Sequence, residues 1–308
     1  MLIFAPKGGA TIAAQMWFRY EGVYEKADAY SKVGEIKFHK YRLHVYNRQP
    51  AHAPLPCAKA CAAGWTCIRL VRQPLDRVVS SYQFGLKNLG AMAATWKELM
   101  VLKTGDETRN STSSLSSSTL NPRIVKILAG TTFEEFISAL TTRAQTKTVS
   151  SADDHFMPQL SNWRDDEKCD SGTVGPSIRK DGTPLVYYLP TECLDDPEAM
   201  LYLGRTTGVV LNATGLTSAH YNRGKVSASY DGLHVASWPW ERVMAKHPPY
   251  ELFTSENASI GRRVCCLFRD DVDMYRRACQ QAWLQNTTTC AAECSSQLAR
   301  LSHVCDIV

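Results

Sequence analysis

Residues 2–11 read Leu-Ile-Phe-Ala-Pro-Lys-Gly-Gly-Ala-Thr, and this stretch decides the fold that we expect. Its apolar start predicts a short strand, its two glycines a tight turn, and the residues from Thr11 onward a helix. Such a turn points backbone N–H groups and the positive end of a helix dipole at one place, which suits an anion. Lys7 adds a full charge and Thr11 a hydroxyl donor. In the Walker pattern a Lys-Ser/Thr pair follows the last glycine, whereas here Lys7 precedes both glycines.

A second stretch, residues 68–82, supports an anion site. Ile68–Val71 predicts another short strand, and Pro74 is placed to begin a helix, where its missing N–H costs nothing. Arg72 follows the strand and Ser80 lies two turns into the helix, so both side chains can bind a phosphate. Ligands of parallel sheets bind at the carboxyl ends of strands. The two motifs therefore predict one ligand with phosphate groups at both ends.

Together the two motifs resemble the nucleotide-binding motifs of sulfotransferases, and most of all those of the Golgi carbohydrate sulfotransferases. The resemblance implies an α/β fold with a P-loop-like central parallel β-sheet flanked by helices. It also implies the co-substrate 3′-phosphoadenosine 5′-phosphosulfate (PAPS) and a carbohydrate acceptor. Ala10 stands where the family often has Thr. By position, the 5′-phosphosulfate site would comprise Lys7, Gly8, Gly9, Ala10 and Thr11, and the 3′-phosphate site Arg72 and Ser80.

Sulfuryl transfer needs a charge on the leaving phosphate and a base for the proton of the acceptor. Lys7 suits the first role, and no metal is expected. The resemblance implies a Glu or His base after the first helix, where the chain offers Glu35 and His39. We favour His39, because an imidazole is largely neutral at working pH, and place Glu35 second. His155, in a segment that resembles a His-aromatic-x-Pro-Gln element of the family, is the next candidate and a candidate substrate ligand; each of these residues could also be structural.

The composition is that of an ordinary globular chain of 308 residues with a net charge of +5. This charge suits an anionic nucleotide and does not indicate a nucleic-acid partner. Eleven cysteines and four glycosylation sequons favour an oxidising lumen such as the Golgi, and the cysteine spacing favours disulfides over zinc. No apolar stretch reaches eighteen residues, so we expect no membrane span in this chain and either an upstream anchor or a non-secreted relative. The sequons begin at Asn110, Asn212, Asn257 and Asn286.

We find no internal repeat or linker, and predict one domain over residues 1–308. It carries a Ser/Thr-rich insertion at about 105–120 and a Cys-rich helical region at about 265–308. Residues 34–46 fit a strand or a helix equally well. The other predicted elements are a helix over 11–30, a helix over 132–140 with a Thr132–Glu135 capping box, a strand over 185–189, a helix from Asp196 ended by Gly204, and a helix over 269–284.

Two other functions remain open at this point. A kinase-like transferase would use the same scaffold, but it needs a magnesium ligand beside a Lys-Ser/Thr pair, which the first motif lacks. A catalytically degenerate lumenal binding protein would keep the fold without turnover. The sequence identifies neither the acceptor nor the oligomeric state.

Overall fold

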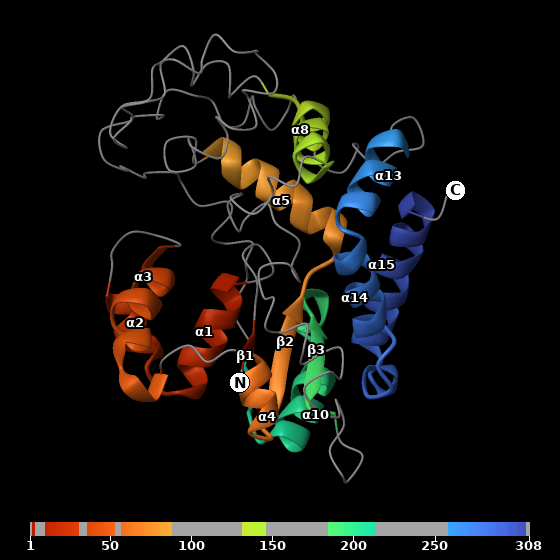
Figure 1. Ribbon diagram of the computed structural model, residues 1–308. Helices are drawn as coiled ribbons and strands as arrows, with labels where there is room; N and C mark the ends of the chain where they lie inside the picture. The colour runs from red at the N-terminus through yellow and green to blue at the C-terminus, as the bar shows by residue number, and fades with distance from the viewer. Residues whose placement is uncertain are drawn as a thin grey trace, which may run out of the picture. The chain divides into compact units, whose positions relative to one another are not determined.

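The computed structural model of the protein describes residues 2–3, 10–30, 36–52, 57–87, 131–145, 184–212 and 258–305 (Figure 1). The chain divides into two compact units. The first draws on residues 1–73, 158–225 and 270–300, and the second on 74–157, 226–269 and 301–308. The predicted insertion at about 105–120 lies outside the described residues, and the assignment of one domain stays a prediction.

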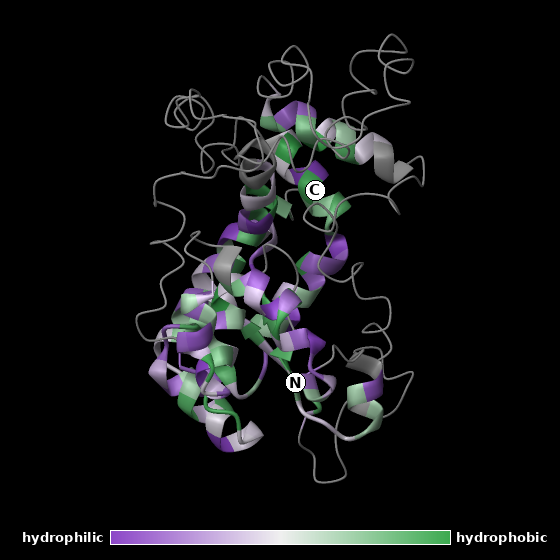
Figure 2. Ribbon diagram, turned by 90° about the vertical axis from the view of Figure 1, so that its left-hand side faces the viewer, coloured by the Kyte–Doolittle hydropathy of each residue, from purple (hydrophilic) through white to green (hydrophobic). Residues whose placement is uncertain are grey.

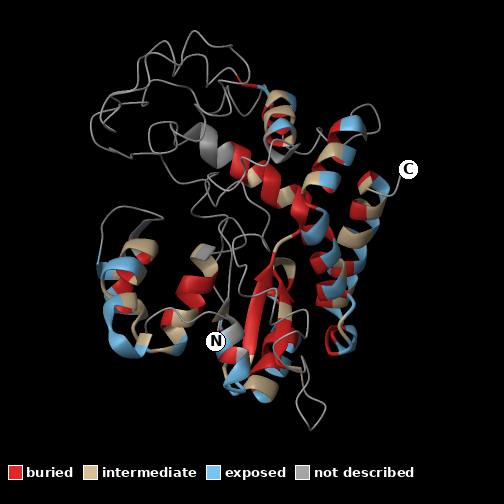
Figure 3. Ribbon diagram, viewed as in Figure 1, coloured by how far each residue is buried: buried red, intermediate tan, exposed pale blue. Residues whose placement is uncertain are grey.

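A small parallel sheet forms the centre of the first unit. It consists of β1 (Leu2–Ile3), β2 (Cys67–Val71) and β3 (Val186–Pro190) in the order β1-β2-β3, and both pairings are parallel. All five residues of β2 are buried, as its red colour in Figure 3 shows. The three predicted strands are therefore confirmed to within one or two residues, and so is their parallel direction. The full P-loop-like central sheet is not seen among the described residues.

The helix predicted over residues 11–30 is two helices, α1 (Ala10–Tyr20) and α2 (Tyr24–Ala29). Gly22 separates them with a φ of 67°. The N–H of Val23 donates to the carbonyl of Phe18 (2.8 Å) and that of Gly22 to the carbonyl of Arg19 (3.1 Å). This pair of bonds is a Schellman motif, which ends a helix on a left-handed glycine. The single-helix prediction was wrong because this glycine can take a conformation that ends α1.

Residues 36–44 form α3 (Ile36–His44), so the helical alternative for residues 34–46 is the one that the protein adopts. A 3₁₀ turn, η1 (Tyr46–Arg48), follows, and a second one, η2 (Pro50–His52), comes after it. The short helix α4 (Cys57–Ala62) then packs against β2. The helices carry both hydrophobic and hydrophilic residues, as Figure 2 shows, which is the pattern of helices with one face in a core.

One buried carboxylate in the first unit caps two helices. Asp196 begins α10 (Pro197–Thr207) and accepts hydrogen bonds from the N–H groups of Glu198 (2.8 Å) and Ala199 (3.3 Å). Its other oxygen accepts from the N–H of Cys290 (2.7 Å) in the first turn of α15 (Thr289–Cys305). Asp196 therefore joins the positive ends of two helices far apart in the sequence.

The end of α10 differs from the prediction. The helix runs through Gly204 and ends at Gly208, whose φ is 72°. A Cβ at position 204 would lie 3.3 Å from the Cγ2 of Val210. Because Gly204 has no side chain, the segment after α10 can pass close to the helix at this point. The sequence rule for helix ends was sound, but it selected the wrong glycine of the two.

The edge of β3 is bound by a side chain from the segment after α14 (Arg269–Cys279). The amide of Gln281 accepts a hydrogen bond from the N–H of Tyr188 (3.0 Å) and donates to the carbonyl of the same residue (2.6 Å). The amide also donates to the carbonyl of Ala278 (2.8 Å), which closes the end of α14. The helix predicted over 269–284 thus ends early; the 3₁₀ turn η10 (Leu284–Asn286) follows.

The second unit contains α5 (Pro74–Lys87), α8 (Phe133–Gln145) and α13 (Ala258–Leu267). Tyr82 of α5 donates a buried hydrogen bond to the carbonyl of Thr131 (2.6 Å), and its ring contacts Phe133 and Phe136. The capping box is confirmed: Thr132 and Glu135 exchange side-chain to backbone bonds of 2.9 and 3.2 Å.

Disulfides, which the sequence favoured over zinc, are confirmed in both units. Cys193 pairs with Cys290 in the first unit and Cys265 with Cys305 in the second. Among the described helices, none has the length and hydropathy that a membrane crossing requires.

The role of Asp196 predicts a large stability effect for one substitution. Asp196→Ala removes three hydrogen bonds from a buried carboxylate, and we expect a loss of roughly 2–4 kcal/mol in the free energy of unfolding. Urea unfolding followed by circular dichroism measures it. The matched control is Asp195→Ala, since Asp195 is exposed and adjacent, and it should change the free energy by less than about 0.5 kcal/mol. Equal effects of the two substitutions would contradict the shared cap.

Candidate functional site

The described residues include part of the predicted nucleotide site. Thr11, His39, Arg72 and Ser80 are described with their side chains, and Ala10 is described as the first residue of α1. The other residues predicted for the site lie outside the described residues; they are Lys7, Gly8, Gly9, Glu35 and His155.

Two of the predicted residues lie in contact. The Thr11 Oγ1 is 3.2 Å from the His39 Nε2, a hydrogen bond between side chains that stand 28 residues apart in the sequence. Both side chains are only partly buried. Neighbouring residues therefore fix the pair on one side, and the other side remains accessible to solvent. The predicted donor-binding hydroxyl and the favoured base therefore form one cluster on two helices, α1 and α3.

An aromatic core holds these two helices together. Ala14 and Phe18 lie on the same face of α1 as Thr11, since the spacing is three and seven residues. They pack against Phe38 and Tyr41 of α3 in a buried cluster that also contains Ala27 and Tyr46. The rings of Phe18 and Tyr41 meet edge to face at 5.3 Å. The packing fixes α1 against α3, and His39 follows Phe38 directly, so this core sets the Thr11–His39 distance.

Tyr46, in the turn after α3, is part of this core, and two side-chain contacts fix its position. Its hydroxyl accepts a hydrogen bond of 2.8 Å from the indole N–H of Trp17, and its ring stacks on His52 at 4.0 Å. Burial raises the pKa of Tyr46 to about 12, against the smaller opposing effect of the Trp17 hydrogen bond. The folded structure therefore favours the neutral phenol of Tyr46 over the ionised phenolate.

The carboxyl ends of β1 and β2 lie on the same side of the sheet. Leu2 pairs with Ile68 and Ile3 with Arg69 in parallel register, so the chain leaves both strands on the same side. Arg72 follows β2 there and is half-buried. Glu192 follows β3 on that side, since Val71 pairs with Pro190. Ser80 lies on α5, in the second unit.

Arg42, to which the sequence motifs assign no role, stands near the favoured base. Arg42 follows His39 by three residues, so the two share a face of α3. Burial lowers the pKa of the Arg42 guanidinium, because the charge is partly removed from water. The spacing of the two residues was the available signal, but it carries weight only once α3 is known to be a helix.

A comparison with protein families bears on this site. The model of the Sulfotransferase family matches residues 15–169, about half of the chain's 308 residues. The matched range contains His39, Arg72 and Ser80, whereas the Lys7 turn precedes it. No curated protein and no solved structure matches the chain.

The raised pKa of Tyr46 predicts a pH-dependent stability. In the unfolded chain an ordinary tyrosine ionises near pH 10, whereas Tyr46 in the folded protein ionises near 12. The contribution of the neutral Tyr46 side chain to the free energy of unfolding is therefore complete below pH 10 and is lost as the pH rises toward 12. We expect Tyr46→Phe to be about 1 kcal/mol less stable than the wild type at pH 8 and roughly equal to it at pH 11.

Urea unfolding at pH 8, 9, 10 and 11 measures this difference. Trp17→Phe is the matched control, because it removes the other partner of the same hydrogen bond and keeps the phenol. Its deficit relative to the wild type should persist at pH 11, because both proteins keep the phenol, and the loss of a bond that lowers the pKa of Tyr46 can only raise that pKa further. A Tyr46→Phe deficit that is constant from pH 8 to 11 would contradict the assignment.

Proposed function

Because the chain belongs to the sulfotransferase family, we propose that it moves a sulfuryl group from PAPS to an acceptor hydroxyl or amine, on a carbohydrate. The observation that carries this proposal is the hydrogen bond between Thr11 and His39. We assign Thr11 to the binding of the donor and His39 to the activation of the acceptor, and a transferase must hold donor and acceptor side by side.

The start of α1 supports the donor site. The first turn of a helix has N–H groups without partners inside the helix, and the first turn of α1 carries no acidic residue. We assign the 5′-phosphosulfate to this turn and to Lys7, Gly8, Gly9, Ala10 and Thr11. We assign the 3′-phosphate to Arg72 and Ser80, on the strength of the motif that they share with the family.

The transfer is an in-line displacement. A bond forms between the acceptor oxygen and sulfur while the bond from sulfur to the bridging phosphate oxygen breaks. The acceptor proton goes to His39, and the charge on the leaving phosphate is stabilised by Lys7. No metal has a role in this scheme.

The contact with Thr11 suggests how His39 serves as the base. In the tautomer in which Nε2–H donates to the Thr11 oxygen, Nδ1 carries the lone pair that takes the acceptor proton. The Thr11 hydroxyl then keeps its own hydrogen for the donor's phosphosulfate. Glu35 is the second candidate for the base and His155 the third; His155 is also a candidate ligand for the acceptor or for PAPS.

A lumenal, glycosylating compartment such as the Golgi fits the described surface. Two disulfides link distant parts of the chain, and the two sequon asparagines among the described residues, Asn212 and Asn286, are both exposed. A glycan acceptor belongs to that compartment.

The leaving-group role predicts the behaviour of Lys7→Ala. We expect kcat with labelled PAPS to fall about 100- to 1000-fold, because one charge on the transition state is lost, while the melting temperature stays within about 2 °C. The matched control is Lys26→Ala, an exposed lysine on α2. Near-native turnover of Lys7→Ala would refute its role.

The same preparation distinguishes the alternatives. Stabilisation by 3′-phosphoadenosine 5′-phosphate supports the PAPS assignment, whereas stabilisation by ATP alone would favour a kinase-like transferase. No sulfated product from any glycan in a panel, despite nucleotide binding, would favour a binding protein without turnover.

The base is tested by a pair of histidines on one helix. We expect His39→Ala to lower kcat about 100- to 1000-fold, and His44→Ala, at the exposed end of α3, to leave kcat within about twofold. Thr11→Val should lower kcat as well, and Thr11→Ser, which keeps the hydroxyl, should restore most of it. Full activity of His39→Ala would move the base to Glu35 or His155, which the corresponding alanine variants would then test.

A further inference from the structure

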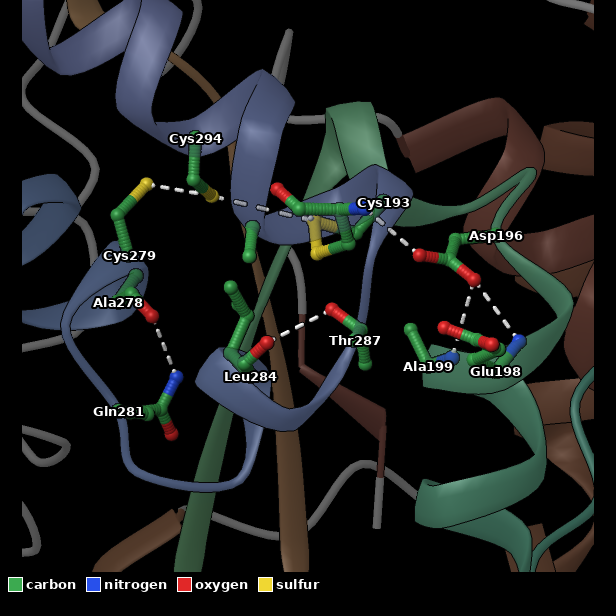
Figure 4. Close-up of a disulfide and its surroundings, with 12 residues drawn as sticks. Cys193, Asp196, Glu198, Ala199, Ala278, Cys279, Gln281, Leu284, Thr287 and Cys294 are labelled. Atoms are coloured by element: carbon green, nitrogen blue, oxygen red, sulfur yellow. Dashed lines mark hydrogen bonds between the residues drawn. A yellow bond between two sulfur atoms is a disulfide. The ribbon is translucent and has the colours of Figure 1, made fainter.

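Four cysteines gather in the core of the first unit, and none of them has a part in the proposed catalysis. They come from the turn after β3, the end of α14 and the first turns of α15 (Figure 4). Each side chain is no more than 1% exposed. The four are Cys193, Cys279, Cys290 and Cys294.

The distances between the sulfur atoms divide the four cysteines into two pairs. Cys193 and Cys290 form a disulfide. The Sγ atoms of Cys279 and Cys294 lie 2.8 Å apart, whereas Cys294 is 3.9 Å from Cys193. Unbonded carbon atoms approach to only about 3.5–4.0 Å, and sulfur is the larger atom. The Cys279–Cys294 contact is therefore too close for two sulfurs that merely pack. The distance between Cys294 and Cys193, in contrast, is compatible with packing alone.

The surroundings of the second pair disfavour a metal site or a reactive thiolate. Metal binding and nucleophilic attack both require the thiolate. The pKa of the Cys294 thiol is raised by its hydrogen bond with Cys279, by burial and by nearby acidic groups. Cys193, Cys290 and Cys294 are close enough to share an ion, but the first two are already bonded to each other.

We propose that Cys279 and Cys294 form a second disulfide, which lies in the same core as the Cys193–Cys290 bond. While the chain folds, before both thiols are buried, they give up two electrons and two protons to a small-molecule disulfide such as oxidised glutathione. One sulfur first forms a mixed disulfide and releases one thiol of the oxidant; the second sulfur then displaces the other thiol. The product is one Cys279–Cys294 bond and two molecules of reduced oxidant.

The bond would close a loop that matters for the sheet. Residues 279–294 include Gln281, whose amide binds both backbone groups of Tyr188 at the edge of β3. Gln285 of the same loop donates to the carbonyl of Cys279 (3.0 Å). A link between the end of α14 and the second turn of α15 would therefore restrict the loop that carries these contacts. This inference does not depend on the sulfotransferase chemistry.

Peptide mapping of the purified full chain tests the bond. The protein is denatured without reductant and alkylated with a maleimide, then reduced and alkylated with an isotope-labelled maleimide. Trypsin leaves Cys279, Cys290 and Cys294 in one peptide, so cleavage after Glu293 and after Trp283 is added to separate them. We expect the second label on Cys279 and Cys294 and the first label on Cys266, an exposed free cysteine that serves as the internal control.

An unreduced digest shows which cysteines are paired. The expected product joins the Cys279 peptide to the Cys294 peptide, and the Cys193 peptide to the Cys290 peptide. The first label on Cys279 and Cys294, a link of either residue to Cys193 or Cys290, or stoichiometric zinc bound to the purified chain would each overturn the proposal.

A stability measurement gives an independent test. The Cys279→Ala/Cys294→Ala double variant should melt about 5 °C below the wild type without reductant, since it loses the cross-link of a 15-residue loop. With a phosphine reductant present throughout, the difference should shrink by at least half. Cys266→Ala should match the wild type in both conditions. A difference that is the same with and without reductant would reflect packing alone and would overturn the proposal.

Discussion

Parallel pairing of three strands is the constraint on which the first unit depends. Parallel strands cannot be joined by a tight turn, so the chain must leave the sheet and return between β1, β2 and β3. All three strands then end at one edge, and every segment that leaves the sheet there begins near the others. Arg72 and Glu192 owe their common side of the sheet to this rule, although a long segment separates them in the sequence.

The aromatic core between α1 and α3 sets the geometry of the candidate site. Phe18, Phe38 and Tyr41 hold the two helices in one orientation, and the Thr11–His39 hydrogen bond lies at the border of this packing. A buried aromatic cluster has few alternative arrangements at native packing density. Thr11 and His39 are therefore held close together while both stay partly exposed, which suits the roles that we propose for them.

The sequence predicted local features well and long-range ones poorly, for physical reasons. Strand positions, the Thr132 cap and the helix after Pro74 depend on neighbouring residues, and the structure confirms them. The break at Gly22 and the passage of α10 through Gly204 depend on how the chain packs afterward, since either glycine is compatible with both outcomes. The contact of Thr11 with His39 could not be read from the sequence, because it needs α3 to be helical and to return against α1. Lys7, which carries most of the proposed chemistry, follows from its motif alone.

The amide of Gln281 has a consequence for how copies of this protein behave toward one another. A strand with open peptide groups is a template on which a second molecule can add a strand and begin a fibril. The side chain of Gln281 saturates the peptide groups of Tyr188 and interrupts that row in its middle. In the described part of the sheet, one glutamine side chain therefore removes the uninterrupted row of open peptide groups that an added strand would need.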